Sequence, residues 1–424
     1  MSDRLPGGAP APRALPDSPN LEWLRKQAKR RLEHTRVEDP AATLAQAQFA
    51  IAKEYGFTSW RALKAHIDGL GIDGQLVAAA RAGDVGALTR LLDAHPERLQ
   101  LRDRPYEWTL LHHAACAGGL AAVALLVARG LGVNVRERGD DTYPIHWAAA
   151  AGCLPVVTWL ADHGADIVGH GDDHMCEVIG WATCFDACHR DVAAFLVQRG
   201  ARHHIFSAVA CELADEVRAI VKANPDALQQ RSSRNEVFRL PLHFAVLKNL
   251  PSMVALLLDL GADPRGVDGS GYPVVVYATA PDVDAAILEL LVERGGTHDL
   301  LTAVAAGDWA AAERFRAEAS HDAGVVGNGA LHLMAKRGNL AAVNWLLERG
   351  ADPNQRWNHW DASVTPLHMA AAFGHVDVVR RLLAAGADAR IPDSKHDGDA
   401  LGWAQYFRQT ETLAVLRQAL HIDE

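Results

Sequence analysis

The chain has 424 residues, of which 49% are hydrophobic and 22% charged, and its formal net charge at pH 7 is −10. Compact folding of a chain this long would give two or three domains of ordinary size. The composition is that of a soluble protein, and no stretch approaches the roughly 18 consecutive apolar residues that a membrane-spanning helix needs. The negative charge disfavours binding of nucleic acid or anionic lipid over the whole surface. We therefore expect no membrane association and no nucleic-acid partner.

The N-terminal residues and the cysteines indicate where the protein acts. Residues 1–19 are rich in Pro, Ala and Gly, which predicts a disordered tail, and they lack the basic and apolar regions of a secretory signal. Six cysteines at irregular spacings are too few for a disulfide framework, so we expect reduced thiols and a cytoplasmic location. Arginine far exceeds lysine and alanine is abundant, as in proteins from GC-rich bacterial genomes.

Residues 20–70 are expected to form three helices, because apolar residues recur there at helical spacing. Each helix would carry one apolar stripe: Leu21, Leu24, Ala28 and Leu32; Leu44, Ala47, Ile51 and Tyr55; Trp60, Leu63, Ile67 and Leu70. A basic run, Arg25–Arg36, lies on the first of these helices. We interpret it as a solvated outer face, with contact to nucleic acid or lipid as the alternative.

From about residue 75 onward the sequence repeats. Each copy places a histidine after a short start and before an alanine: Thr109–Ala114, Tyr143–Ala148, Leu240–Ala245, Thr365–Ala370 and, in degenerate form, Gly329–His332. A second block, Leu-Leu-x-x-Gly-Ala-Asp, stands at Leu257–Asp263, Leu346–Asp352 and Leu382–Asp388. His112 and His146 are 34 residues apart. This period is typical of helix–turn–helix units, which cannot bury an apolar face alone and must stack.

Each block has a local physical role. Thr caps a helix, Pro fits its first position, and Gly supplies the left-handed residue that ends the second helix. These features resemble the ankyrin repeat family, whose signature is Thr-Pro-Leu-His-x-Ala at about 33 residues. The resemblance covers residues 75–424. It implies an all-α solenoid of about eleven helix pairs with finger loops, to which residues 20–70 would add an N-terminal helical cap.

Departures from the pattern predict how the stack is divided. Three segments lack the Thr-Pro start: Leu76–Asp84, Phe206–Leu213 and Leu301–Asp308. We therefore expect sub-stacks that begin near residues 75, 205 and 300. In two repeats Gly180 and Gly402 replace the histidine, and the Trp that follows each is expected to fill the space.

The repeated histidines could be read as a catalytic or metal-binding row. They are His112, His146, His243, His332 and His368. A residue that recurs in every unit serves the unit, however. We expect these side chains to hydrogen-bond the backbone of their own and neighbouring turns.

A stretch rich in His, Cys and Asp, residues 163–211, supports the alternative view of function. Within it His170, His174, Cys184 and Cys188 approach the spacing of zinc ligands. No CxxC pair or matching second half accompanies them, and a solvated finger with packed cysteines explains the same residues. We find no phosphate loop, nucleophile elbow or other catalytic motif. The prediction is therefore a chain without metal or cofactor that is not an enzyme.

The resemblance implies that finger loops and first helices line a concave surface that binds partners. The candidate partner-binding residues occupy the corresponding positions and the long loop after Gly350: Tyr106, Trp108, Phe185, Arg239, Lys248, Lys336, Arg337, Trp357, His359, Trp360, Phe373, Tyr406 and Phe407. Exposed Trp, Tyr and Arg side chains often contribute ~2 kcal/mol or more each to an interface. The predicted function is a scaffold that holds a partner protein in its concave groove. The alternative is an enzyme, or a small-molecule or metal receptor, built on residues 163–211.

Overall fold

A computed structural model describes residues 21–103, 106–318, 329–359 and 362–421 of the chain. The predicted tail, residues 1–19, and the candidate Trp360 lie outside the described residues. The structure divides into two compact units between Gly169 and His170, called here the first and the second unit. Among the described residues, no helix has the length and apolar character needed to cross a membrane.

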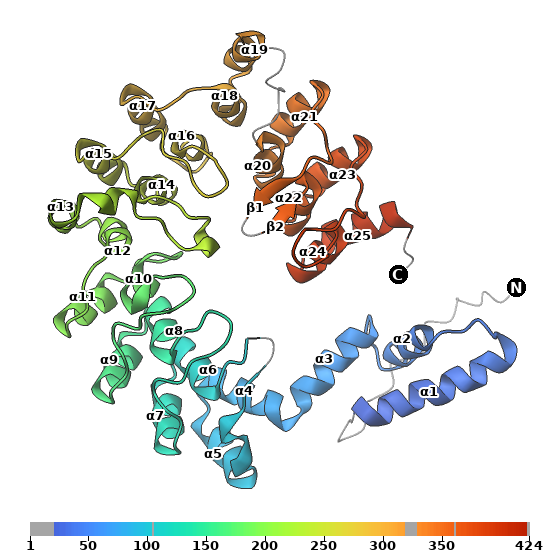
Figure 1. The fold of residues 1–424 in the computed structure, drawn as a ribbon. Coiled ribbons are helices and arrows are strands. Elements are labelled where there is room, and N and C mark those ends of the chain that lie inside the picture. The colour runs from blue at the N-terminus through green and yellow to red at the C-terminus, as the bar shows by residue number, and fades with distance from the viewer. Residues whose placement is uncertain (1–20, 104–105, 319–328, 360–361, 422–424) are drawn as a thin grey trace, which may run out of the picture. The chain divides into compact units, whose positions relative to one another are not determined.

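The first unit consists of helices joined by turns and loops (Figure 1). Its elements are α1 (Leu21–Glu38), α2 (Leu44–Glu54), α3 (Trp60–Leu70), α4 (Ile72–Ala82), α5 (Val85–Ala94), the 3-10 helix η1 (Pro96–Gln100), α6 (Leu110–Cys116), α7 (Leu120–Ala128), α8 (Pro144–Ala150) and α9 (Leu154–Asp162). Helices α1–α3 coincide with the three helices predicted over residues 20–70. They share a core of their own, built from Leu24, Ala28, Ile51, Ala52, Tyr55, Leu63 and Ile67.

Local capping explains where two of these helices begin. The Thr43 hydroxyl accepts the backbone N–H of Gln46 at 3.3 Å, and the Gln46 amide oxygen accepts the Thr43 N–H at 2.8 Å. Ser59 accepts the N–H of Ala62 at 3.1 Å at the start of α3. These bonds satisfy backbone donors that have no partner inside a helix.

The second unit continues the helix pairs. Its elements are α10 (Glu177–Thr183), α11 (Arg190–Gln198), α12 (Ile205–Ala210), α13 (Ala214–Ala223), η2 (Pro225–Gln229), η3 (Arg234–Glu236), α14 (Pro241–Leu247), α15 (Pro251–Asp259), α16 (Val274–Tyr277), α17 (Ala285–Glu293), α18 (Leu300–Ala306), α19 (Trp309–Glu318), α20 (Ala330–Lys336), α21 (Leu340–Glu348), β1 (Trp357–His359), β2 (Ala362–Val364), α22 (Pro366–Ala372), α23 (Val376–Ala384), α24 (Ala400–Tyr406) and α25 (Thr410–Leu420). The two short strands pair antiparallel, with Trp357 opposite Val364.

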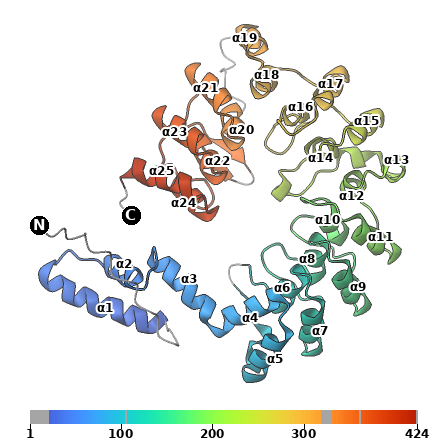
Figure 2. The ribbon, with the colours of Figure 1, turned by 180° about the vertical axis from the view of Figure 1, so that it is seen from behind.

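Counted from α4, the described residues form eleven helix pairs, as the repeat pattern predicts. Within the second unit, first helices pack on first helices (α12 on α14, α20 on α22, α22 on α24) and second helices on second helices (α15 on α17, α21 on α23). Figure 2 shows the two rows from behind. A hydrophobic core runs from Ile205 to Leu420 through this unit. Stacking therefore buries the apolar faces that one pair leaves exposed.

The repeated histidines are structural, as predicted. Each points its Nε2 at a backbone carbonyl oxygen that lies 23 to 32 residues further along the chain: His112 at Thr142 (3.2 Å), His146 at Gly169 (3.1 Å), His243 at Tyr272 (3.3 Å), His332 at Val364 (3.1 Å) and His368 at Gly398 (3.0 Å). Where a Thr precedes the helix, Nδ1 of the histidine accepts the backbone N–H of that Thr, at 3.3 Å for Thr109 and 3.2 Å for Thr365. An Nδ1 that accepts and an Nε2 that donates require a neutral ring. Each histidine thus ties its helix to the next finger.

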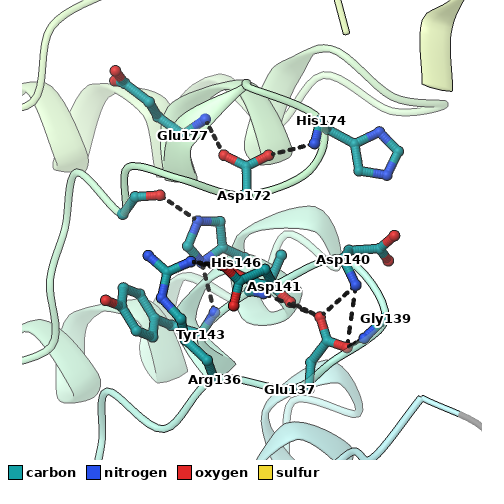
Figure 3. A network of polar contacts seen from close by, with 12 residues as sticks. Arg136, Glu137, Gly139, Asp140, Asp141, Tyr143, His146, Asp172, His174 and Glu177 are labelled. Atoms are coloured by element: carbon teal, nitrogen blue, oxygen red, sulfur yellow. Dashed lines mark hydrogen bonds and ion pairs between the residues drawn. The ribbon is translucent and has the colours of Figure 1, made fainter. Parts of the chain in front are cut away.

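A buried acidic residue in several fingers is a second repeated element, which the sequence patterns did not reveal. Figure 3 shows Glu137 accepting backbone N–H groups from Gly139 and Asp140, and Asp172 accepting those of His174 (3.1 Å) and Glu177 (2.9 Å). Asp268 and Asp393 repeat this arrangement, and all four are at most 3% exposed.

An aromatic donor from the following helix completes three of these acid sites. Trp181 Nε1 donates to Asp172 at 3.1 Å, the Tyr277 hydroxyl donates to Asp268, and Trp403 Nε1 donates to Asp393 at 2.9 Å. The Trp after Gly180 and the Trp after Gly402 therefore hold the finger by a hydrogen bond as well as filling space. A loop acid followed nine or ten residues later by Trp or Tyr is the sequence signal for this site.

Candidate functional site

Ten of the thirteen candidate partner-binding residues line three cavities of the second unit. The first cavity, of about 200 Å³, includes Arg239, Lys336, Arg337, Trp357, His359 and Phe373. The second, of about 410 Å³, includes Phe185 and Lys248 and shares Arg239 with the first. The third, of about 700 Å³, includes Tyr406 and Phe407. The finger at residues 231–239, which carries η3, contributes to all three cavities.

The first cavity combines positive charge with aromatic walls. Lys336 ends α20, Arg337 follows it, and Arg239 comes from the finger before α14. The Lys336 ammonium lies 3.4 Å from His359 Nε2 and 5.2 Å from the centre of the Phe373 ring. The Arg239 guanidinium lies 5.6 Å from the centre of the Tyr277 ring.

The basic side chains of the first cavity alter one another's ionisation. Burial, and after it the charge of Arg239, lowers the pKa of Lys336 to about 8. Burial, and then the charges of Lys336 and Arg239, lowers the pKa of His359 to about 3. At neutral pH the cavity therefore holds a charged lysine and a neutral histidine.

Trp357 is half-buried and makes packing contacts within the second unit. Its Nε1 donates to the Ser270 carbonyl oxygen at 3.2 Å, and its ring centre lies 6.3 Å from that of Tyr272. The Tyr272 hydroxyl donates to the Gly329 carbonyl oxygen at 2.9 Å. These bonds join the finger before α16 to the start of α20 and to β1, and they set one wall of the first cavity.

The aromatic candidates that line the three cavities differ in their exposure to solvent. Tyr406 is 71% exposed and Phe373, on the rim of the first cavity, is 40% exposed. Phe185 is half-buried, and its ring lies edge-on to that of Trp181 with centres 4.9 Å apart. The Lys248 ammonium donates to the Phe185 carbonyl oxygen.

Two candidates, Tyr106 and Trp108, belong to the first unit. Tyr106 is 49% exposed. Trp108 is half-buried, and its ring centre lies 4.3 Å from that of Trp147 and 5.0 Å from that of His113. Trp108 is therefore partly a packing residue between consecutive repeats.

The four candidate metal ligands lie in the second unit and point to different partners. His170 Nδ1 lies 3.0 Å from Glu177 Oε1, and His174 Nδ1 lies 2.5 Å from Glu236 Oε1. Cys188 Sγ lies 3.5 Å from Cys211 Sγ, and Cys184 contacts the Thr183 hydroxyl at 3.7 Å. In the described part of the chain, no group of three or more His, Cys, Asp or Glu side chains could hold a metal ion. The neighbouring Asp172 is occupied by backbone and Trp181 donors.

Comparison with known families identifies the repeat. The family model described as ankyrin repeats (3 copies) matches residues 76–170, 242–393 and 331–423, which together make up more than half of the chain. The chain therefore belongs to the ankyrin repeat family. Repeats of this family generally serve as protein-interaction modules, which supports a protein-binding role for this chain.

Individual relatives share only parts of the chain. It is 28% identical over 201 residues to the nuclear factor NF-kappa-B p105 subunit of Gallus gallus. The matched region makes up 41% of this chain and 19% of that relative. It is 41% identical over 73 residues to protein phosphatase 1 regulatory subunit 27 of Homo sapiens, which covers 17% of this chain and 44% of the relative. The chain thus spans less than half the length of these curated relatives. Among solved structures, the human ASB11 ankyrin repeat domain is similar with a TM-score of 0.38 and 22% identity, covering 53% of this chain and 98% of that one.

Proposed function

We propose that this protein is a cytoplasmic scaffold that holds a partner protein in a groove formed by the three cavities of the second unit. The observation that carries the proposal is the gathering of aromatic and basic candidates around those cavities. A scaffold of this kind needs neither catalytic groups nor a cofactor. All six cysteines are free thiols, which suits a reducing compartment.

The exposed aromatic residues would supply most of the binding energy. Tyr406 and Phe407 in the third cavity and Phe373 at the first are at least 36% exposed, so a partner can bury them. Aromatic side chains that become fully buried at the centre of an interface are typical hot spots, worth ~2 kcal/mol or more each. The half-buried Lys248 and Arg239 would set the orientation of the partner through hydrogen bonds.

Site-specific photo-crosslinking tests this proposal. In one variant a photo-reactive residue replaces Tyr406, inside the proposed groove. In a matched variant it replaces Arg380, which is exposed on α23, the second helix of its pair. In lysate of the source organism, the Tyr406 position should capture a protein that the Arg380 position does not. The double variant Phe373→Ala, Phe407→Ala should abolish this capture while its circular dichroism stays unchanged. Equal capture at both positions, or capture at Arg380 alone, would show that the partner does not use the groove.

A further inference from the structure

The first cavity contains more positive charge than its surroundings neutralise. Three cations line it, Arg239, Lys336 and Arg337, and one carboxylate, Asp268. Within the described residues, none of the three cations lies within ion-pair distance of a carboxylate. Arg337 instead donates to neutral oxygens, at 2.9 Å to the Val276 carbonyl and at 3.0 Å to the Thr279 hydroxyl.

The single carboxylate of the cavity is already committed to its own finger. One Asp268 oxygen accepts the backbone N–H groups of Ser270 at 2.8 Å and Tyr272 at 2.9 Å. The other oxygen accepts the Tyr277 hydroxyl. Asp268 is 3% exposed, and these three hydrogen bonds hold its carboxylate in the finger. Both of its oxygens are therefore occupied by these donors, while its charge offsets only one of the three cations that line the cavity.

One donor in the cavity has no acceptor. Arg239 Nε is buried and, among the described residues, has no hydrogen-bond partner. A buried donor left unsatisfied costs about 1–3 kcal/mol, and more when it belongs to a charged group. An incoming oxygen atom would remove this cost. The same oxygen would offset the mutual repulsion of Arg239 and Lys336, which contributes to the low pKa of Lys336.

The size of the cavity limits what can enter. A volume of about 200 Å³ admits a small group rather than a nucleotide. Tyr277, Trp357 and Phe373 form aromatic walls that would contact the organic part of a ligand. A planar guanidinium fits the oxygens of carboxylate or phosphate. Three cations and the Asp268 carboxylate leave an excess of two positive charges, which two negative charges balance better than one.

We propose that the first cavity is an oxyanion site that binds a phosphate monoester group, held by Arg239 and Lys336 with Arg337 close behind. The phosphate belongs either to a phosphorylated side chain of a partner or to a small phosphomonoester. This site goes beyond the scaffold function and does not depend on it, because a free anion can occupy the cavity without a protein partner.

Calorimetric titration of the full chain with inorganic phosphate at pH 7 tests the site. The key variant is Lys336→Met, which removes the charge and keeps the hydrocarbon stem. The matched control is Lys248→Met, which removes the same charge at the end of α14, beside the second cavity. We expect saturable binding of one phosphate to the wild type and to Lys248→Met, and at least tenfold weaker binding to Lys336→Met. Thermal unfolding gives a second readout, since phosphate should raise the melting temperature of the first two proteins only.

Three outcomes would overturn the proposal: no saturable phosphate binding to the wild type, an equal loss in both variants, or acetate binding as tightly as phosphate. The Lys336→Met protein should fold at least as well as the wild type, because it removes a half-buried charge. Phenyl phosphate and a phosphoserine hexapeptide then distinguish the two sources of the phosphate group. The probe that binds more tightly than inorganic phosphate identifies the source, and its affinity must also fall in Lys336→Met.

Discussion

Mild acid should destabilise this protein through its buried histidines. His112, His243, His332 and His359 are at most 5% exposed. Burial is the main cause that lowers the pKa of His112 and His359 to about 3 and that of His243 and His332 to about 4. In the unfolded chain each has a pKa of about 6.5. The unfolded state therefore binds more protons between pH 6.5 and about 4.

The sign and size of the effect follow from this difference. Stability is fully present above pH 6.5 and is lost as the pH falls towards the folded-state pKa. From pH 7 to pH 5.5 each histidine costs about 1 kcal/mol, so the four together cost about 4 kcal/mol. Carboxylates contribute at lower pH. For Asp393, burial opposes ionisation, but hydrogen bonds from Trp403 and three backbone N–H groups outweigh it and lower the pKa to about 2.

Urea unfolding at pH 7.0 and pH 5.5, followed by circular dichroism, measures the loss of stability. The His332→Gln variant should lose about 1 kcal/mol less between the two pH values than the wild type, whatever its absolute stability. An NMR titration of the histidine ring protons should show that these four residues stay neutral down to pH 5, together with His204, whose pKa burial lowers to about 4. Equal unfolding midpoints at both pH values, or ring signals that all titrate near pH 6.5, would refute the reasoning.

Three further predictions concern stability. Gly329→Ala places a methyl group 2.5 Å from the Trp357 ring at a φ of 68°, and should cost about 2–4 kcal/mol of unfolding free energy. Gly350→Ala has a similar φ with nothing within 4 Å, so an equal loss in urea titrations of the two variants would contradict the proposed clash. Asp393→Ala leaves four hydrogen-bond donors without their acceptor and should lower the unfolding free energy by about 3 kcal/mol. Asp377 is exposed, and Asp377→Ala should lower it by less than about 1 kcal/mol in the same assay. Chemical denaturation should show more than one transition if sub-stacks begin near residues 205 and 300, and a single transition seen by every probe would argue against them.

The repeat architecture could be predicted because its determinants are local. The Thr start, the histidine and the closing glycine of each unit act within about ten residues or on the adjacent unit, as His112 and Thr142 illustrate. Their positions therefore recur in the sequence at one period. The same logic predicted α1–α3 from their apolar stripes. The unit that begins at Tyr272 lacks the repeated histidine but still contains a first helix, α16, of four residues.

Which ionisable and metal-ligating side chains lie close together depended on the tertiary structure. His174 and Cys188 are close in sequence, yet they contact Glu236 and Cys211, because finger and helix positions point in different directions. Arg239 and Lys336 are 97 residues apart, yet they line one cavity. That meeting depends on how a finger and a distant helix end are packed within the second unit. The sequence by itself thus determined the unit and its stacking, since both rest on contacts between near neighbours. Only the tertiary structure determined that Arg239, Lys336 and Arg337 gather in the first cavity, because these residues come from repeats that are distant in the sequence.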